Sequence, residues 1–313
     1  MQQLRKFEIR QVDVFTSETF CGNPAGVVPE AKELTDKEMQ LIAREINLSE
    51  TAFILPSDKA DLRIRWFSPK REVLFCGHAT IASLHVLTEK GYFGMKDGHF
   101  QVKIETMIDV ISADVYKTHS KTRISLSIPQ FHLIEEKLDR DELAQALNIK
   151  KSDIHVSYPV MRDTIQGYVY VAVRDLETLR KIDYDYNKLE IFGNRYGIKG
   201  FTVLTDDTIE KDSDVHSRFF SPFYGVIEDP VTGSSHGPLG VYCILNNMLK
   251  KSRDNEYVIK AEQGDIMGRP GRIIVIVTKE QDNTYITRII GNAVTFFTGQ
   301  LYLSSHRASN QSI

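Results

Sequence analysis

The pattern of apolar and polar residues predicts many short strands. Apolar and polar side chains alternate in Leu62–Phe67 (LRIRWF), the two-residue period of a strand with one buried face. Similar alternation or short apolar runs predict further strands at residues 7–15, 51–55, 100–105, 108–116, 122–128, 154–161, 168–173, 201–205, 215–221, 256–261, 272–278, 285–291 and 294–303.

The helices predicted by the same pattern are of two kinds. Residues 35–47, 139–148 and 175–182 are amphipathic and begin with N-cap residue types, and Thr35 with Glu38 forms a capping-box pattern. Residues 78–90, followed by Gly91, and residues 235–250 are apolar or small on every side, which is typical of a fully buried helix. Many strands around such a helix predict an α+β fold in which a mostly antiparallel β-barrel surrounds a central α-helix.

The segments before the two buried helices resemble each other. RWFSP at residues 65–69 and RFFSP at 218–222 lie about half the chain apart, and each is followed by a glycine-led turn and then the buried helix. This shared order favours a duplication into two pseudosymmetric lobes with a site in the cleft between them. We expect residues 1–118, joined by the final strand at about 294–303, to form the N-terminal lobe, and residues 119–293 the C-terminal lobe.

Composition narrows the class of protein. The 313 residues carry a net charge of −3, so no basic field favours nucleic acid or an anionic membrane. No apolar run approaches the ~18 residues of a membrane-spanning helix, and the first 15 residues lack the apolar core of a signal peptide. Three widely spaced cysteines, without a CxxC pair, favour a reducing compartment and no metal site. We therefore expect a cytoplasmic protein.

The starts of the two buried helices are candidate anion sites. Unpaired N–H groups and the helix dipole favour a negative charge there, and glycine lets a ligand approach the backbone. The residues at these starts are Gly77, His78 and Ala79 in the first half, and Gly233, Ser234 and Ser235 in the second. Since neither turn matches a phosphate-binding loop, a small carboxylate is the predicted ligand.

Three titratable residues are candidates for chemistry in the cleft. Glu50 lies between a predicted helix and an apolar strand, where desolvation would raise its pKa and let it act as acid and base near neutrality. A solvent-exposed residue at the start of the strand is the alternative for Glu50. His78 and Asp229 flank the helix starts; a structural hydrogen bond and a turn, respectively, are their alternatives.

At these residues the chain resembles the PhzF family of phenazine biosynthesis-like proteins, in the diaminopimelate epimerase superfamily. The resemblance rests on VDVFTSETFCGNPAGVV at 12–28, NLSETAF at 47–53, RWFSPKREVLFCGHATIAS at 65–83 and EDPVTGSSHG at 228–237. It covers nearly the whole chain and implies two pseudosymmetric lobes, each a barrel around a helix. It also implies isomerisation by proton transfer without a cofactor, and makes a homodimer an expectation.

The resemblance assigns roles to individual residues. It implies that Glu50 is the acid and base, and that His78, Asp229 and Ser234 orient the substrate. The superfamily's epimerases use one cysteine from each lobe. Here Cys76 stands near the first such position, whereas the second corresponds to Pro230, so a paired-thiol mechanism is excluded and Cys76 is interpreted as a small buried residue.

Three functions remain open at this point. The first is an isomerase acting on a small carboxylate-bearing metabolite. The second is a non-catalytic protein that binds a small carboxylate or serves as a scaffold on the same fold. The third is a lyase that abstracts a proton at the same site.

Overall fold

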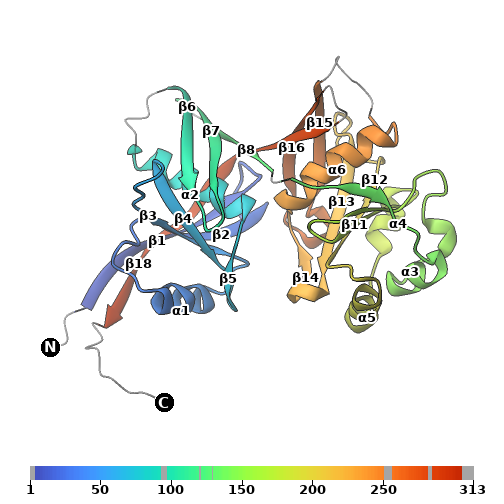
Figure 1. The fold of residues 1–313 in the computed structure, drawn as a ribbon, viewed down its shortest axis with the longest axis horizontal. Coiled ribbons are helices and arrows are strands. Elements are labelled where there is room, and N and C mark those ends of the chain that lie inside the picture. Colours follow the sequence, from blue (N-terminus) through green and yellow to red (C-terminus); the bar gives the residue numbers. More distant parts are fainter. Residues whose placement is uncertain are drawn as a thin grey trace.

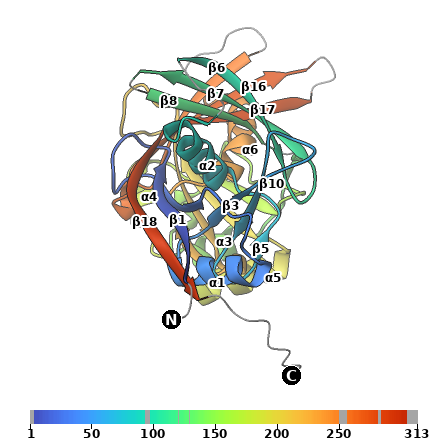
Figure 2. The ribbon, with the colours of Figure 1, turned by 90° about the vertical axis from the view of Figure 1, so that its left-hand side faces the viewer.

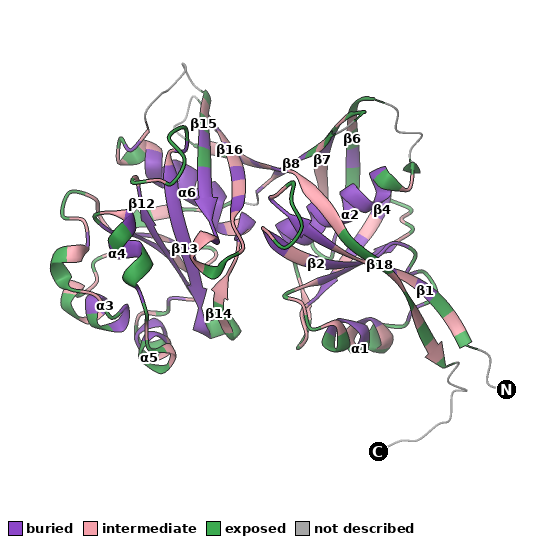
Figure 3. Ribbon diagram, turned by 180° about the vertical axis from the view of Figure 1, so that it is seen from behind, coloured by how far each residue is buried: buried purple, intermediate pink, exposed green. Residues whose placement is uncertain are grey.

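The computed structural model describes residues 4–92, 97–119, 121–128, 130–249, 256–280 and 284–304. Figure 1 shows two lobes side by side, one containing α2 (Gly77–Glu89) and the other α6 (Gly233–Leu245). In Figure 2, α2 lies in the middle of the strands of its lobe. Every residue from Gly77 to Thr88 is buried, and in α6 every residue from Gly233 to Cys243 except Ser234 is buried, as the composition of both segments predicts (Figure 3).

The other elements of the first lobe come from the two ends of the chain. They are β1 (Leu4–Val14), β2 (Asn23–Val28), α1 (Asp36–Ile46), β3 (Thr51–Leu55), β4 (Leu62–Phe67), β5 (Glu72–Val73), β6 (Gly98–Glu105), β7 (Val110–Thr118) and β18 (Ala293–Ser304). The strand β8 (Lys121–Ser127) joins the two lobes, because it pairs with β7 and with β17.

The second lobe comes from the middle of the chain. Its elements are β9 (Leu133–Glu135), α3 (Arg140–Ala146), η2 (Lys151–Asp153), β10 (Met161–Asp163), β11 (Tyr168–Ala172), α4 (Leu176–Lys181), α5 (Tyr186–Tyr196), β12 (Gly200–Thr205), β13 (Val215–Ser221), η3 (Pro222–Tyr224), β14 (Val226–Asp229), β15 (Glu256–Gln263), η4 (Asp265–Met267), β16 (Gly271–Lys279) and β17 (Tyr285–Gly291).

Strand pairing repeats between the lobes. β2 and β3 pair in parallel, as do β4 and β6, and their counterparts β11–β12 and β13–β15 are parallel too. The antiparallel pairs β1–β2, β3–β4, β4–β5, β6–β7 and β7–β8 recur as β10–β11, β12–β13, β13–β14, β15–β16 and β16–β17. β8 also pairs with its own counterpart β17, so the two lobes share a continuous hydrogen-bonded sheet. The expected lobe boundary near residue 118 stays a prediction.

A partly buried ion pair is repeated at the strand before each buried helix. Arg65 binds Glu72 with two hydrogen bonds of 2.7 Å and lies over the Phe67 ring. Arg218 likewise binds Glu228 with two hydrogen bonds of 2.8 Å and lies over the Phe220 ring. The RWFSP and RFFSP segments therefore share a structural function as well as their letters.

Several sequence predictions need correction. Residues 154–161 are mostly a loop, because Pro159 has no N–H to pair; only Ile154 forms an isolated bridge, and β10 begins at Met161. The helix predicted at 235–250 ends at Leu245. The sequence pattern did not predict α5, which has a glycine at position 193 in its interior, or β2, which has a glycine and a proline. No described helix is long and apolar enough to cross a membrane.

We expect Arg218→Met to lower the free energy of unfolding by about 3 kcal/mol, because it leaves the largely enclosed Glu228 carboxylate, whose side chain is 12% exposed, without its partner. Arg218 also donates to the carbonyl oxygens of Leu179 and Ile182, which lose their donors as well. Urea unfolding followed by circular dichroism measures the loss. Arg65→Met is the matched control and should cost less, since Asp36, one of its two partners, is largely exposed. Equal losses in both variants would contradict this account.

Candidate active site

The starts of α2 and α6 adjoin each other across the lobes. A Cβ placed on Gly77 would lie 3.4 Å from Cδ1 of Ile289, and one on Gly233 would lie 2.9 Å from the same atom. Only glycine fits comfortably at position 233, because real Cβ atoms do not approach so closely. Neither N-cap residue, Cys76 or Thr232, makes a side-chain hydrogen bond to its helix start. Two positive helix ends therefore converge on one region.

Local backbone geometry carries Glu50 to this region. Asn47 ends α1 in the left-handed conformation (φ 56°), which turns the chain toward β3. The carbonyl oxygen of Glu50 accepts a hydrogen bond of 3.1 Å from the amide of Gly26, which fixes the backbone beside β2. The Glu50 side chain is 22% exposed, so a ligand can reach it although protein surrounds most of it.

Glu50, Cys76 and His78 form a compact cluster. Nε2 of His78 lies 3.5 Å from Oε2 of Glu50 and 3.3 Å from the hydroxyl of Ser49. Nδ1 of His78 lies 3.5 Å from Sγ of Cys76. The structure therefore brings the predicted Glu50 and His78 together, and it adds Ser49 and Cys76. Cys76 is buried, as predicted, but it lies within the site.

Burial controls the charge states in this cluster. Desolvation, together with the nearby Asp229 carboxylate, raises the pKa of Glu50 to about 7, although hydrogen bonds from Ser49 and Cys76 oppose the shift. Desolvation lowers the pKa of His78 to about 4, so its imidazole is neutral near neutrality. Burial and the Glu50 charge raise the pKa of the Cys76 thiol well above its usual value. The cluster therefore holds a carboxyl group that exchanges protons near neutral pH beside a neutral imidazole.

Asp229 is held by a residue of the other lobe. Nδ2 of Asn23, in β2, donates hydrogen bonds of 2.9 Å both to Oδ1 of Asp229 and to the carbonyl oxygen of Val231. The hydroxyl of Thr232 donates to Oδ2 of Asp229, at 2.5 Å. Burial raises the pKa of Asp229 although both of these donors lower it. Asn23 is fully buried, so this link between the lobes is shielded from water.

The loop before Asn23 is fastened to the second lobe as well. The guanidinium of Arg269 donates to the carbonyl oxygens of Cys21 and Gly22 and to the carboxylate of Asp13. The amide of Gly22 donates to the carbonyl oxygen of Pro270. The CGNP segment at residues 21–24 therefore fixes the relation between the lobes, a role that its turn-like sequence did not reveal.

The remaining predicted site residues differ in whether a ligand could reach them. Ser235 is fully buried, and both its amide and its hydroxyl donate to the carbonyl oxygen of Thr232, so it supports the helix start instead of facing the cleft as expected. Ala79 is fully buried in the first turn of α2. Ser234 is partly exposed, and its hydroxyl lies beside the phenol of Tyr168, a residue that the sequence analysis missed.

The structure also corrects the comparison of the two halves. Cys76 is the N-cap of α2, and the N-cap of α6 is Thr232, so the counterpart of Cys76 is Thr232 and not Pro230. A second thiol is still lacking at that position. The ligand-type atoms of Glu50, Cys76 and His78 all lie within 4.8 Å of one another, so these three could together coordinate a metal ion. Sequence spacing missed this set because Glu50 is distant in the chain.

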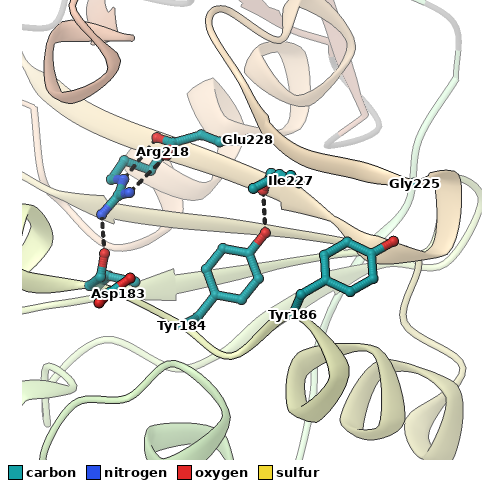
Figure 4. A pocket seen from close by; sticks show the side chains of 8 residues that line it. Asp183, Tyr184, Tyr186, Arg218, Gly225, Ile227 and Glu228 are labelled. Carbon is teal, nitrogen blue, oxygen red and sulfur yellow. Dashed lines mark hydrogen bonds and ion pairs between the residues drawn. The ribbon is translucent and has the colours of Figure 1, made fainter.

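A pocket of about 490 Å³ lies in the second lobe and is lined by no residue of this cluster (Figure 4). Its polar groups are already used within the protein: Arg218 binds Glu228, Tyr184 donates to the carbonyl oxygen of Ile227, and Tyr186 donates to that of Pro222. This pocket therefore offers few free groups for binding a ligand, and the cluster at the helix starts is the better candidate site.

Comparison with known proteins identifies the family. The sequence profile of the phenazine biosynthesis-like protein family (PhzC-PhzF) matches residues 12–299. The chain belongs to the PhzF family. An uncharacterized isomerase of Clostridium acetobutylicum is 35% identical to this PhzF-family chain over 96% of it and 100% of the relative. Trans-2,3-dihydro-3-hydroxyanthranilate isomerase of Pseudomonas chlororaphis is 30% identical over 93% of this chain and 98% of that enzyme.

Solved structures agree with the predicted fold class. The PhzF-family protein of Bacillus anthracis superposes with a TM-score of 0.85 at 28% identity, covering 95% of this chain and 99% of that one. A hydroxyproline epimerase of Agrobacterium vitis superposes with a TM-score of 0.59 at 13% identity, covering 97% and 95%, which shows a shared fold alone. The predicted α+β epimerase-like fold is therefore confirmed for this PhzF-family member.

We expect Asn23→Ala to lower the free energy of unfolding by about 2 kcal/mol or more, because Asp229 and the Val231 carbonyl lose a donor in a buried place. Chemical unfolding followed by fluorescence measures the change. Asn246→Ala is the control: its half-buried side chain donates mainly to a carbonyl oxygen of its own helix, so it should cost less. A cost for Asn23→Ala no larger than that of the control would show that the link contributes little.

Proposed function

We propose that this chain is a cofactor-independent isomerase that moves a proton between two positions of a small carboxylate-bearing metabolite. The observation that carries the proposal is the partly exposed Glu50, whose pKa is raised to about 7 beside two converging helix starts. A carboxyl group with that pKa both accepts and returns a proton near neutral pH. The isomerase names of relatives that match the chain over nearly their full length support the same class of reaction.

In this proposal the other groups bind and orient the substrate. The amides at Gly77, His78, Gly233 and Ser234 hold the substrate carboxylate and stabilise negative charge that develops when Glu50 removes a proton from carbon. Neutral His78, Asp229 and the Ser234 hydroxyl orient the polar groups. Glu50 then returns the proton to another carbon of the same molecule, so no group is lost. Trans-2,3-dihydro-3-hydroxyanthranilate, named for one relative, suggests a cyclic carboxylate as a first candidate substrate.

Two other functions remain alternatives. A lyase would begin with the same proton abstraction but release part of the substrate, so product analysis separates it from an isomerase. A non-catalytic binding protein would bind carboxylates without any exchange at carbon. The partial exposure of Glu50, together with its pKa of about 7, favours chemistry over binding alone.

We expect Glu50→Gln to abolish proton exchange at carbon while carboxylate binding persists, because the amide keeps the shape of the side chain but cannot accept the proton. The parent and the variant are incubated in D₂O with a panel of cyclic amino acids and dihydroaromatic acids, and deuterium uptake is measured by mass spectrometry. Ser57→Ala, on a loop of the same lobe, is a control that should keep exchange. Uptake that continues in Glu50→Gln contradicts the role of Glu50.

The rate should depend on pH through Glu50. The base must be ionised to accept a proton, so kcat/KM for exchange should rise as pH passes through about 7 and level off above it. Below that pH the rate should fall about tenfold for each pH unit. Asp229→Asn should move the midpoint to lower pH, because a negative charge that opposes ionisation of Glu50 is removed. A profile that is flat across neutrality, or a midpoint that moves upward, contradicts this assignment.

A further inference from the structure

Three cationic side chains lie where the lobes meet. Lys70 and Arg71 belong to the turn between β4 and β5, which is closed by a hydrogen bond from the amide of Ser68 to the carbonyl oxygen of Arg71. Lys199 directly precedes β12 in the other lobe. We call these three residues the cationic rim.

The rim contacts the exposed aromatic residues of η3. The guanidinium carbon of Arg71 is 5.9 Å from the centre of the Tyr224 ring, across the lobe boundary. Nζ of Lys70 is 3.2 Å from where a Cβ would stand on Gly225, and Nζ of Lys199 is 5.7 Å from the centre of the Phe223 ring. The two rings are perpendicular and 4.9 Å apart, so one aromatic pair carries cations from both lobes.

The charges of the rim are not balanced by acidic groups. In the described ranges of the chain, Lys70, Arg71 and Lys199 form no ion pair and donate no hydrogen bond to a carboxylate. A contact with an aromatic face leaves the N–H donors of a cation free. Phe223 and Tyr224 are 49% and 41% exposed, so this surface is open to a ligand.

Tyr168 connects the rim to the cluster around Glu50. Its register partner in the sheet is Gly200, the residue after Lys199. Its phenol lies beside the Ser234 hydroxyl at the start of α6, and the charges of Asp229 and Glu50 as well as Tyr224 act on it. One side chain therefore lies beside the start of α6 and within electrostatic reach of Tyr224, the ring that Arg71 contacts.

We propose that the cationic rim binds a second carboxylate of the substrate, so that the substrate class is a dicarboxylate whose first carboxylate lies at the helix starts. This inference rests on the proposed function and extends it to the distal part of the substrate. The inner cluster has the carboxyl groups of Glu50 and Asp229, which repel a second anion, while the outer rim attracts one. The charge pattern therefore favours one orientation of a long substrate.

The test compares dicarboxylates with monocarboxylates of the same length by isothermal titration calorimetry. The probes are glutarate, adipate, pimelate and suberate, each against its monocarboxylate, pentanoate to octanoate. We expect the best dicarboxylate to bind the parent roughly tenfold more tightly than its monocarboxylate, and added salt to reduce that advantage. The triple variant Lys70→Gln, Arg71→Gln, Lys199→Gln should lose the advantage and keep its affinity for the monocarboxylate.

A matched triple variant controls for the change in net charge. Lys32→Gln, Lys59→Gln and Lys211→Gln remove three exposed lysines without ion pairs in the described residues, and this variant should keep the preference. If the parent does not prefer dicarboxylates, or if the rim variant keeps that preference, the proposal that the cationic rim binds a second carboxylate is wrong. Binding of the monocarboxylate tests the helix starts separately from the rim. If the monocarboxylate binds and proton exchange occurs, but dicarboxylates bind no more tightly, only the proposal for the rim is wrong. If no carboxylate binds the folded parent, the proposed function and the rim both fail.

Discussion

The hydrogen bonds of the Asn23 amide hold the two halves of the site in one arrangement. Both N–H groups of this buried side chain cross from β2 to the second lobe, where they reach Asp229 and the residue before the N-cap of α6. The position of α6 relative to α2, and the field of Asp229 at Glu50, both depend on this link. A shift of the lobes would therefore change the geometry and the charge of the site together.

Duplication explains the scaffold but not the chemistry. Both lobes repeat the same strand pairings, the same arginine–glutamate pair and a buried helix with a glycine start. The polar residues placed on this scaffold differ, because His78 stands opposite Ser234 and Cys76 opposite Thr232. A symmetric frame thus supports an asymmetric set of groups, which suits a reaction in which one base returns a proton to a different carbon.

The sequence predicted well what depends on local signals. The Thr35–Glu38 capping box, the left-handed Gly91 after α2 and the bounds of β3 and β4 all appear in the structure, because neighbouring residues determine them. Glu50 and His78 could be identified as candidates, but their distance could not. Asn23, Ser49, Cys76 and Tyr168 were missed as site residues because their partners lie in distant segments. The counterpart of Cys76 was placed two residues too early, at Pro230 instead of Thr232.

The pairing of β1 with β18 has a consequence for the order of folding. β18 is the last strand that the structure describes, and all eleven residues of β1 pair with it. On the ribosome, β1 emerges before β18 and cannot pair with it until β2 to β17 have been made, whereas β9 to β17 can pair earlier because they are contiguous. Contacts so distant in the sequence form slowly. The lobe that contains Glu50 is therefore closed by its β1–β18 pair only after the contiguous strands of the other lobe have been made.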